Sequence, residues 1–308
     1  MSITKSKNLI HILPKNSLAG FNYPLIADLN NDGYLDYLTT TTEIGSNIGL
    51  PIKLFLSNKL GAFYDSQNLI NDNFTSLWTQ RIVAADLNND GLQDVVIGAA
   101  PEQGNASRVN TSNHLNWGCP QYVLFQNIDG TFTPVQTIST TFEAHSINVA
   151  DFNNDGFADI LYVSDINGAN QPPKLLLNTG KKSFVNADLS NLIGLGDAAN
   201  NFHSFYSAVG DFNNDGNQDI IFLNGGFQHG QFDFIAFGKG NGEFEKGPLL
   251  PMVPDSMGGE YATEEGDAAL DLNHDGYLDL MVWVIDRMRF VLIVRFLNII
   301  LSFKEYLL

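Results

Sequence analysis

Short apolar segments rich in Val, Ile, Leu, Phe and Tyr recur along the chain and predict β-strands. They come in pairs separated by a polar stretch: "YPLIA" and "DYLTTTT", "RIVAA" and "DVVIGAA", "SINVA" and "DILYVSD", "YSAVG" and "DIIFLNG". Segments of this length and composition, bounded by turn residues, are typical of strands. No stretch before residue 285 holds a helical period over 12 or more residues. The pattern therefore predicts strand–loop–strand units.

A second, weaker pattern follows each unit in phase. It is an apolar run, then a turn of Gly, Asn and Lys, then a Phe: "KLFLSNKLGAF", "YVLFQNIDGTF", "KLLLNTGKKSF" and "FIAFGKGNGEF", which end at Phe63, Phe132, Phe184 and Phe244. Each run and its turn predict two further strands. One repeat should therefore contain four strands.

The polar stretches share one nine-residue pattern, D-x-N-x-D-G-x-x-D, which we call the acidic loop. It occurs five times, at 28–36, 86–94, 151–159, 211–219 and 271–279, and the first aspartates are 58, 65, 60 and 60 residues apart. Four strands in about 60 residues match a propeller blade, whereas a β-solenoid usually has a much shorter period. We predict an all-β fold, a β-propeller of about five four-stranded blades.

The last part of the chain departs from this pattern. We assign residues 1–284 to the propeller and set 285–308 apart as an atypical apolar segment, because it contains no Gly–Phe turn. Its 14-residue run 290–303 is shorter than the ~20 residues of a membrane-spanning helix and contains Arg295 and Asn298. Three interpretations stay open: abnormal final strands, a frame-shifted or truncated tail, and a membrane-associated segment.

Composition narrows the possible partners. The net charge of −18 disfavours nucleic acid, whose phosphates require Lys and Arg. Fifteen of the 34 acidic residues lie in the five loops, so one divalent cation in each loop would bring the net charge to −8. The single cysteine, Cys119, excludes an internal disulfide and a Cys-based zinc cluster. The N-terminus has no long apolar core of a signal peptide.

The acidic loop has the chemistry of a calcium site. Three carboxylates within nine residues repel one another, and a cation bound among them removes this repulsion. Calcium takes six to eight oxygen ligands. Positions 1, 3, 5 and 9 supply side-chain oxygens, position 7 a backbone carbonyl, and the Gly at position 6 permits the tight turn. The predicted ligands, up to five Ca²⁺ sites, are Asp28, Asn30, Asp32, Tyr34, Asp36, Asp86, Asn88, Asp90, Leu92, Asp94, Asp151, Asn153, Asp155, Phe157, Asp159, Asp211, Asn213, Asp215, Asn217, Asp219, Asp271, Asn273, Asp275, Tyr277 and Asp279.

Other interpretations of the loop are weaker. A helix–loop–helix calcium site needs Glu at position 12, but position 12 is never acidic here. Zinc is disfavoured because no ligand position holds Cys or His, and His274 occupies position 4, which points outward. A solvated Asn-Asp-Gly turn would explain one copy, but not five copies that all keep the four ligand positions. Three carboxylates per site suggest modest affinity, suited to the calcium concentration outside cells.

These residues resemble the FG-GAP/VCBS repeat family, which includes the propellers of integrin alpha subunits. The five acidic loops with their flanking strands, and the "NIDGTF" and "GNGEF" turns, carry the resemblance over about residues 20–284. It implies a calcium-binding propeller in a secreted or surface protein. Members of the family act in adhesion, bind glycans or form parts of polysaccharide-degrading enzymes. The family usually closes with seven blades, so five loops indicate either a five-bladed ring or a truncated larger one.

The favoured function is a binding or adhesion module for a glycan or a protein. The second repeat carries an insertion within 101–120, where Arg108, His114 and Trp117 are candidate partner-binding residues. A polysaccharide lyase or hydrolase is the enzymatic alternative, although His145, His203 and His229 occupy unrelated phases of the repeat and no catalytic residue is assigned. A structural fragment of a larger repeat protein is the third interpretation.

Overall fold

The structure is a computed structural model of the chain. It describes residues 20–42, 50–70, 74–76, 79–99, 119–164, 172–192, 206–223, 234–250, 264–271, 274–284, 289–294 and 302–307. Within these ranges the chain forms strands and two short 3₁₀ turns, η2 (Gln67–Leu69) and η5 (Ser190–Leu192), and contains no α-helix. The predicted all-β class is confirmed.

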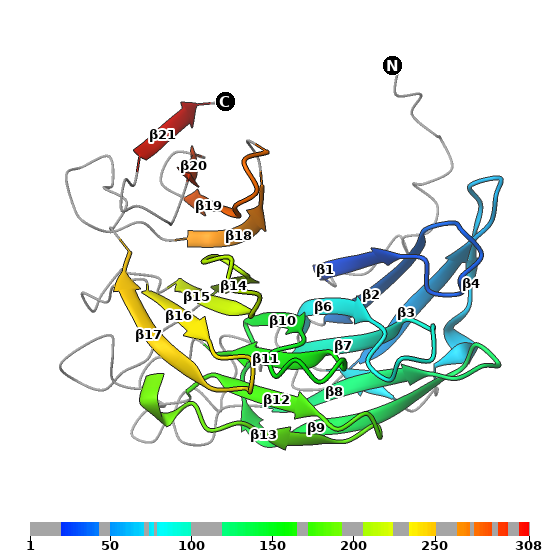
Figure 1. Ribbon diagram of the computed structural model, residues 1–308. Helices are drawn as coiled ribbons and strands as arrows, with labels where there is room; N and C mark the ends of the chain where they lie inside the picture. The colour runs from blue at the N-terminus through cyan, green and yellow to red at the C-terminus, as the bar shows by residue number, and fades with distance from the viewer. Residues whose placement is uncertain are drawn as a thin grey trace, which may run out of the picture.

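The strands form five antiparallel sheets in chain order, which we call blades 1 to 5 (Figure 1). Blade 1 contains β1 (Gly20–Ala27), β2 (Asp36–Thr42), β3 (Leu50–Ser57) and β4 (Phe63–Asp65), with β5 (Thr75–Ser76) paired to β3. Blade 2 contains β6 (Thr79–Ala85), β7 (Asp94–Ala99), β8 (Cys119–Gln126) and β9 (Phe132–Phe142). Blade 3 contains β10 (Ser146–Ala150), β11 (Asp159–Val163), β12 (Lys174–Asn178) and β13 (Phe184–Asn186).

The last two blades repeat the same order. Blade 4 contains β14 (Tyr206–Gly210), β15 (Asp219–Leu223), β16 (Phe234–Gly238) and β17 (Phe244–Leu249). Blade 5 contains β18 (Glu264–Leu270), β19 (Asp279–Val284), β20 (Arg289–Val294) and β21 (Ser302–Leu307). In blades 1 to 4 the fourth strand begins at the Phe that ends the predicted turn pattern. β20 and β21 lie after residue 284, in the segment set apart by its composition, and pair as the outer strands of blade 5.

Blades 2, 3 and 4 are covered on both faces, which explains why their second strands are apolar at nearly every position. In β11, Ile160 and Tyr162 pack toward blade 2, whereas Leu161 and Val163 pack toward blade 4. Successive side chains of a strand point to opposite faces. A strand between two cores therefore shows a continuous apolar run in place of a polar alternation.

Four hydrophobic clusters fill the four spaces between neighbouring blades. They are centred on Leu54 and Val95 between blades 1 and 2, on Phe125 and Tyr162 between blades 2 and 3, on Phe152 and Phe244 between blades 3 and 4, and on Ile221 and Leu280 between blades 4 and 5. The first strands β1, β6, β10, β14 and β18 contact one another in this order along the inner side. These contacts between successive blades are those of a propeller.

The five blades follow one another along an open arc, with blades 1 and 5 at its ends (Figure 1). No sheet closes the arc in the part of the chain that the structure describes. At the free end of blade 1, Ile26 and Leu35 are each 61% exposed. Their structural equivalents in blade 3, Val149 and Ala158, pack against blade 2. Two apolar side chains on the rear face of blade 1, next to the acidic loop, are therefore exposed in the described structure.

None of the described segments forms a helix long and apolar enough to cross a membrane.

Candidate functional site

The acidic loops occupy equivalent places in all five blades, between the first and second strands. Each loop begins directly after the inner strand, and its ninth residue starts the next strand. The first and second strands pair in the same register in every blade. The residue before the loop always pairs with the ninth residue of the loop: Ala27 with Asp36, Ala85 with Asp94, Ala150 with Asp159, Gly210 with Asp219 and Leu270 with Asp279. The loops therefore lie at the same end of every blade.

Hydrogen bonds to backbone amides fix the side chains at positions 1, 3 and 5. In blade 1, the two carboxylate oxygens of Asp28 accept bonds from the backbone N–H groups of Asp32 (3.1 Å) and Gly33 (2.8 Å). Asn30 Oδ1 also accepts from the Asp32 amide at 3.1 Å, and Asp32 Oδ1 accepts from the Tyr34 amide at 2.9 Å. The loops of blades 2, 3 and 4 repeat these bonds.

Two residues of each loop have positive φ, and they produce its tight curvature. The Gly at position 6 has φ between 83° and 89° in the five copies, as the sequence predicted. The residue at position 4 has φ between 56° and 58°, and it is Asn in four loops and His274 in the fifth. Asn is among the few residues with a side chain that tolerate this conformation. The sequence therefore favours this backbone at both positions.

The aspartate at position 9 is buried and ties the loop to the third strand of its own blade. In blade 1, Asp36 Oδ2 accepts from the Leu29 amide and Oδ1 from the Ser57 amide, both at 2.8 Å. Asp94, Asp159 and Asp219 make the same two kinds of bond, to the residue at loop position 2 and to the end of the third strand. All five ninth-position aspartates are at most 1% exposed. This carboxylate therefore closes the loop from inside the blade.

Burial changes the acidity of these carboxyl groups. Removal from water raises the pKa of Asp94, Asp159 and Asp219 to about 6, and it also raises the pKa of Asp36. The backbone hydrogen bonds act in the opposite direction, and the negative charges at positions 1 and 5 raise the pKa further. In contrast, hydrogen bonds lower the pKa of the exposed Asp215.

The donor chemistry of the loop fits a hard divalent cation. Among the described residues, no three His, Cys, Asp or Glu side chains converge closely enough to hold a metal on their own. Each loop nevertheless offers amide oxygen in addition to carboxylate oxygen, and an oxygen that accepts one hydrogen bond keeps a second lone pair. The charges at positions 1 and 5 also raise the pKa at position 9, an effect that a cation would reverse. All of these donors are oxygens, the ligands that calcium prefers.

In blades 1 to 4, the side chain at position 4 links the loop to the next blade. Asn31 Nδ2 donates to the backbone oxygen of Gly91 at 2.8 Å, and Asn89 Nδ2 donates to that of Gly156 at 2.9 Å. The remaining two links run from Asn154 Nδ2 to Asn217 Oδ1 at 2.8 Å and from Asn214 Nδ2 to the Gly276 oxygen at 3.2 Å. Sequence analysis did not identify these links, although Asn at position 4 in four copies was the visible signal.

Some predicted residues lie outside the described part of the chain. The structure does not describe 101–118, which includes the candidate partner-binding residues Arg108, His114 and Trp117. The same is true of Asn273 in the fifth loop. The assignments of these residues stay predictions.

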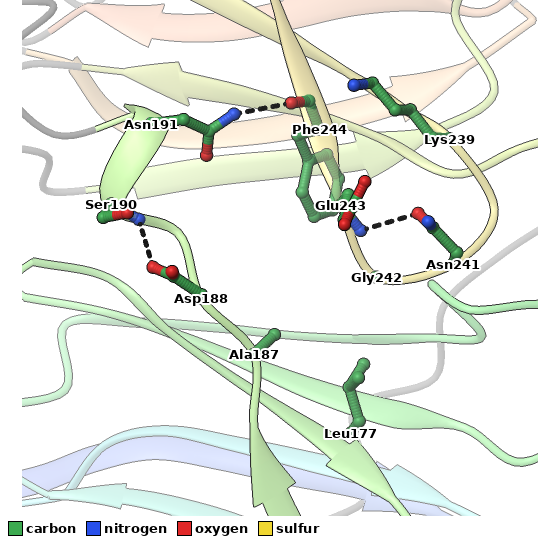
Figure 2. A pocket seen from close by; sticks show the side chains of 10 residues that line it. All are labelled: Leu177, Ala187, Asp188, Ser190, Asn191, Lys239, Asn241, Gly242, Glu243 and Phe244. Atoms are coloured by element: carbon green, nitrogen blue, oxygen red, sulfur yellow. Dashed lines mark hydrogen bonds between the residues drawn. The ribbon is translucent and has the colours of Figure 1, made fainter.

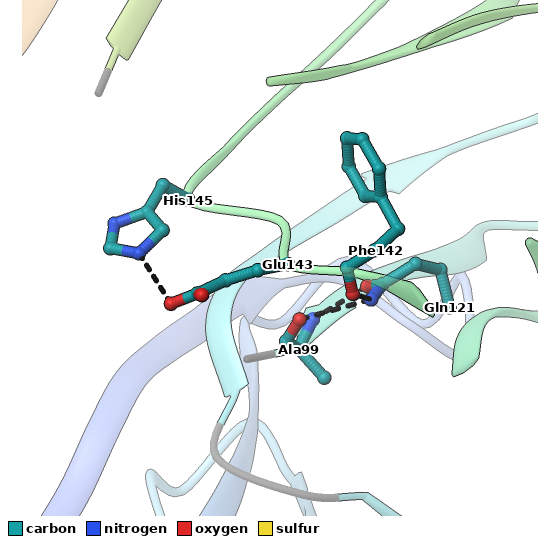
Figure 3. Close-up of polar contacts among 5 residues, drawn as sticks. All are labelled: Ala99, Gln121, Phe142, Glu143 and His145. Atoms are coloured by element: carbon teal, nitrogen blue, oxygen red, sulfur yellow. Dashed lines mark hydrogen bonds and ion pairs between the residues drawn. The ribbon is translucent and has the colours of Figure 1, made fainter. Parts of the chain in front are cut away.

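His145 lies directly before β10, where it pairs with an acid that sequence analysis missed. Its Nε2 is 2.9 Å from Oε1 of Glu143, and the Glu143 side chain is only 5% exposed (Figure 3). Nearby, Gln121 bonds both backbone groups of Ala99 and the Phe142 carbonyl. The only signal in the sequence was that an acid lies two residues before the histidine. These contacts fix the path of the chain from blade 2 into blade 3.

Comparison with known proteins gives one family and several distant structures. A family model described as an FG-GAP-like repeat matches residues 28–97, 115–162, 151–222 and 211–282. No curated protein matches the sequence significantly.

Three solved structures resemble this chain at low sequence identity. The V. cholerae biofilm matrix protein Bap1 is 16% identical with a TM-score of 0.43, over 89% of this chain and 38% of that one. Rhamnogalacturonan lyase YesW is 12% identical with a TM-score of 0.41, over 88% and 56% of the two chains. BBS1N, solved in complex with ARL6DN, is 9% identical with a TM-score of 0.40, over 87% and 78%. The chain thus spans less than two thirds of the first two proteins.

Proposed function

Because the chain belongs to the FG-GAP-like repeat family, we propose that it is a calcium-binding β-propeller module that binds a glycan or a protein outside the cell or at its surface. One observation carries the calcium part of this proposal: the same hydrogen-bonded loop of oxygen donors recurs in successive blades. A solvated turn would not need the same carboxylates at the same positions each time.

The residues of each loop have distinct roles in this proposal. Positions 1, 3 and 5 would hold the ion with side-chain oxygens that the backbone amides already orient. Position 9 anchors the loop to the third strand from within the blade. Calcium, when bound, supplies the positive charge that balances these carboxylates. The ion would therefore stabilise the blade and would not react with a substrate.

The binding part of the proposal follows from charge and architecture. The net charge of −18 opposes association with nucleic acid. Blades packed through four hydrophobic clusters form a rigid support, and the loops on such a support commonly carry binding functions. Millimolar calcium suits sites of this ligand number, which supports a location outside the cell or at its surface.

Thermal melting tests the calcium part directly. A ligand that binds only the folded state stabilises it by about 2.7 kcal/mol per site at 100 times its Kd. We therefore expect the Tm to rise in several millimolar CaCl₂ relative to chelator, with a smaller rise in MgCl₂. Calorimetric titration should give about five ions for the native chain and one fewer for Asp155→Ala. An identical Tm with calcium and with chelator would contradict the proposal.

The binding part is tested with an array of immobilised glycans and a panel of extracellular matrix proteins. We expect at least one of these surfaces to retain the protein in calcium and to release it in chelator. A protein that shows calcium stabilisation but binds neither class would keep the calcium assignment and lose the binding function.

A further inference from the structure

A pocket lies between blades 3 and 4, outside the acidic loops. Its volume is about 410 Å³, within the range of about 300–1,000 Å³ that is typical of small-ligand sites. One wall is the segment from Ala187 to Asn191 that follows β13, together with Leu177 of β12. The other wall is the turn from Lys239 to Phe244 that joins β16 to β17 (Figure 2). The pocket therefore exists only when the two blades are packed together.

Hydrogen bonds hold several polar side chains of this pocket in place. Asn191 Nδ2 donates to the Phe244 carbonyl at 2.7 Å, and this bond joins the two walls. Asp188 Oδ1 accepts from the Ser190 amide at 2.9 Å, and Asn241 Oδ1 accepts from the Glu243 amide at 3.0 Å (Figure 2). These bonds leave the Asn191 oxygen and the Asn241 amide group able to bond a ligand. Side chains that are already oriented lose less entropy on binding.

The charged groups of the lining carry both signs. Asp188 and Glu243 repel phosphate and other anions, and the Lys239 ammonium balances one of these two carboxylates. Hydrogen bonds from Ser190 keep the pKa of Asp188 below its ordinary value, so this group is ionised at neutral pH. A hydroxyl group both donates and accepts, so it can bond a carboxylate, an amide and an ammonium in turn. A ligand with several adjacent hydroxyls matches this lining.

The apolar part of the pocket supports the same ligand class. Leu177 and Ala187 lie together at one side of the pocket, next to the polar groups of both walls (Figure 2). A sugar ring has hydroxyls around its edge and C–H groups on its faces. Its hydroxyls would meet Glu243, Asn241 and Asn191, and its C–H face would cover the two aliphatic side chains.

We propose that the pocket between blades 3 and 4 binds a neutral saccharide unit, with Glu243, Asn241 and Asn191 bonding adjacent hydroxyls. This inference rests on the proposed binding function and assigns it a place and a ligand class. It does not involve the metal-binding residues.

The test uses the full chain in calcium buffer and two sets of probes. Calorimetry or saturation-transfer NMR is carried out with neutral gluco-, galacto- and manno-oligosaccharides and, separately, with uronic-acid oligosaccharides. We expect binding to a neutral member, with the affinity lowered at least tenfold by Glu243→Ala and by Asn241→Ala. Both residues are exposed, so both variants should fold. The matched control is Glu245→Ala, which removes another exposed carboxylate two residues further on, in β17 and outside the pocket, and should change the affinity less than twofold.

The possible outcomes separate the inference from the proposed function. If the native chain binds neutral saccharides and both pocket variants bind equally well, the pocket is not the site, although the binding function stands. Binding to uronic-acid oligosaccharides alone would overturn the assigned ligand class. If calcium stabilises the protein and only protein ligands bind, the saccharide inference fails and the general function survives. Failure of calcium stabilisation together with failure of all binding would overturn both.

Discussion

The aspartates of one acidic loop differ in burial and in hydrogen-bond partners, and these differences indicate different roles. Asp28 and Asp32 are exposed or partly exposed and bond amides of the loop itself, whereas Asp36 is fully buried and bonds the third strand. A buried carboxylate is costly unless its hydrogen bonds are satisfied. The ninth position therefore needs Asp to join the loop to the blade even without an ion, whereas the aspartates at positions 1 and 5 bond only amides of the loop itself.

The raised pKa values at position 9 predict an unusual pH dependence for the calcium-depleted protein. The pKa of Asp94, Asp159 and Asp219 is about 6 in the folded state and about 3.9 in an unfolded chain. Between these values the folded state binds more protons, so the free energy of unfolding should decrease as pH rises from about 4 to about 7. Urea unfolding of calcium-depleted protein at pH 5 and pH 7 measures this difference.

Calcium provides the control for this prediction. A cation bound in the loop would favour the ionised form of the buried ninth carboxylate, so saturating calcium should stabilise the folded state more at pH 7 than at pH 5. The trend of stability with pH should therefore have opposite signs with and without the ion. A calcium-depleted protein that is more stable at pH 7 than at pH 5 would show that the ninth carboxylates are not destabilised by burial.

At the scale of elements, a blade is held to the next one by polar links as well as by its core. The first of these links is the position-4 amide, which reaches the following loop from blades 1, 2, 3 and 4. A second comes from the third strand: Gln126 and Asn178 donate their side-chain amides to the carbonyls of Leu29 and Leu87 in the preceding blade. These links join the acidic loops into a connected row.

Removal of one link should weaken the contact between two blades. Asn89→Gly keeps the positive φ that Asn89 adopts and deletes the bond to Gly156. We expect a loss of about 0.5–1.5 kcal/mol in the free energy of unfolding, which is the usual net value of one hydrogen bond. Chemical denaturation monitored by tryptophan fluorescence gives this quantity.

The fifth loop supplies a matched control for this variant. His274 occupies the same position with the same backbone conformation, and it is exposed at the end of the row. His274→Gly should therefore be neutral or slightly stabilising, because it relieves backbone strain without breaking a link. Equal destabilisation by both variants would mean that the loop backbone, and not the link, determines the effect.

At the scale of the whole molecule, the environment of a blade face depends on whether another blade packs against it. The rear face of blade 1 exposes Ile26 and Leu35, whereas every internal interface covers the corresponding side chains. In blade 5, Leu278 holds the position that Leu35 holds in blade 1, and it packs against blade 4. A Cβ on Gly210 would lie 2.3 Å from Cδ1 of Leu278. The same position of the acidic loop is therefore exposed in blade 1 and packed in blade 5, because a preceding blade covers it only in blade 5.

This pair of leucines gives a direct test of the arrangement. Leu278→Ala removes contacts between blades 4 and 5 and should cost about 1–2 kcal/mol, at or below the lower end of values for fully buried leucines because Leu278 is only partly buried. Leu35→Ala removes a side chain that is 61% exposed and should change stability by less than about 0.5 kcal/mol. Urea unfolding of both variants measures the difference. Equal losses would indicate that the rear face of blade 1 is covered in solution.

Sequence alone determined the elements and their repetition. Paired apolar runs, the Gly–Phe turns and the spacing of about 60 residues predicted four strands per blade, and the structure has them. The glycine at position 6 also predicted its own positive φ, because few other residues adopt it. These features depend on neighbours in the chain, so a local pattern is sufficient to specify them.

Only the tertiary structure decided which residues meet across blades. The link from Asn31 to Gly91 and the pocket that joins Asn191 to Phe244 bring together residues that are 60 and 53 positions apart. The tertiary structure alone also decides that the arc is open, because the exposure of Leu35 depends on whether another blade packs against it. Such contacts form because the blades stack on one another, and the sequence pattern within one repeat does not specify how they stack.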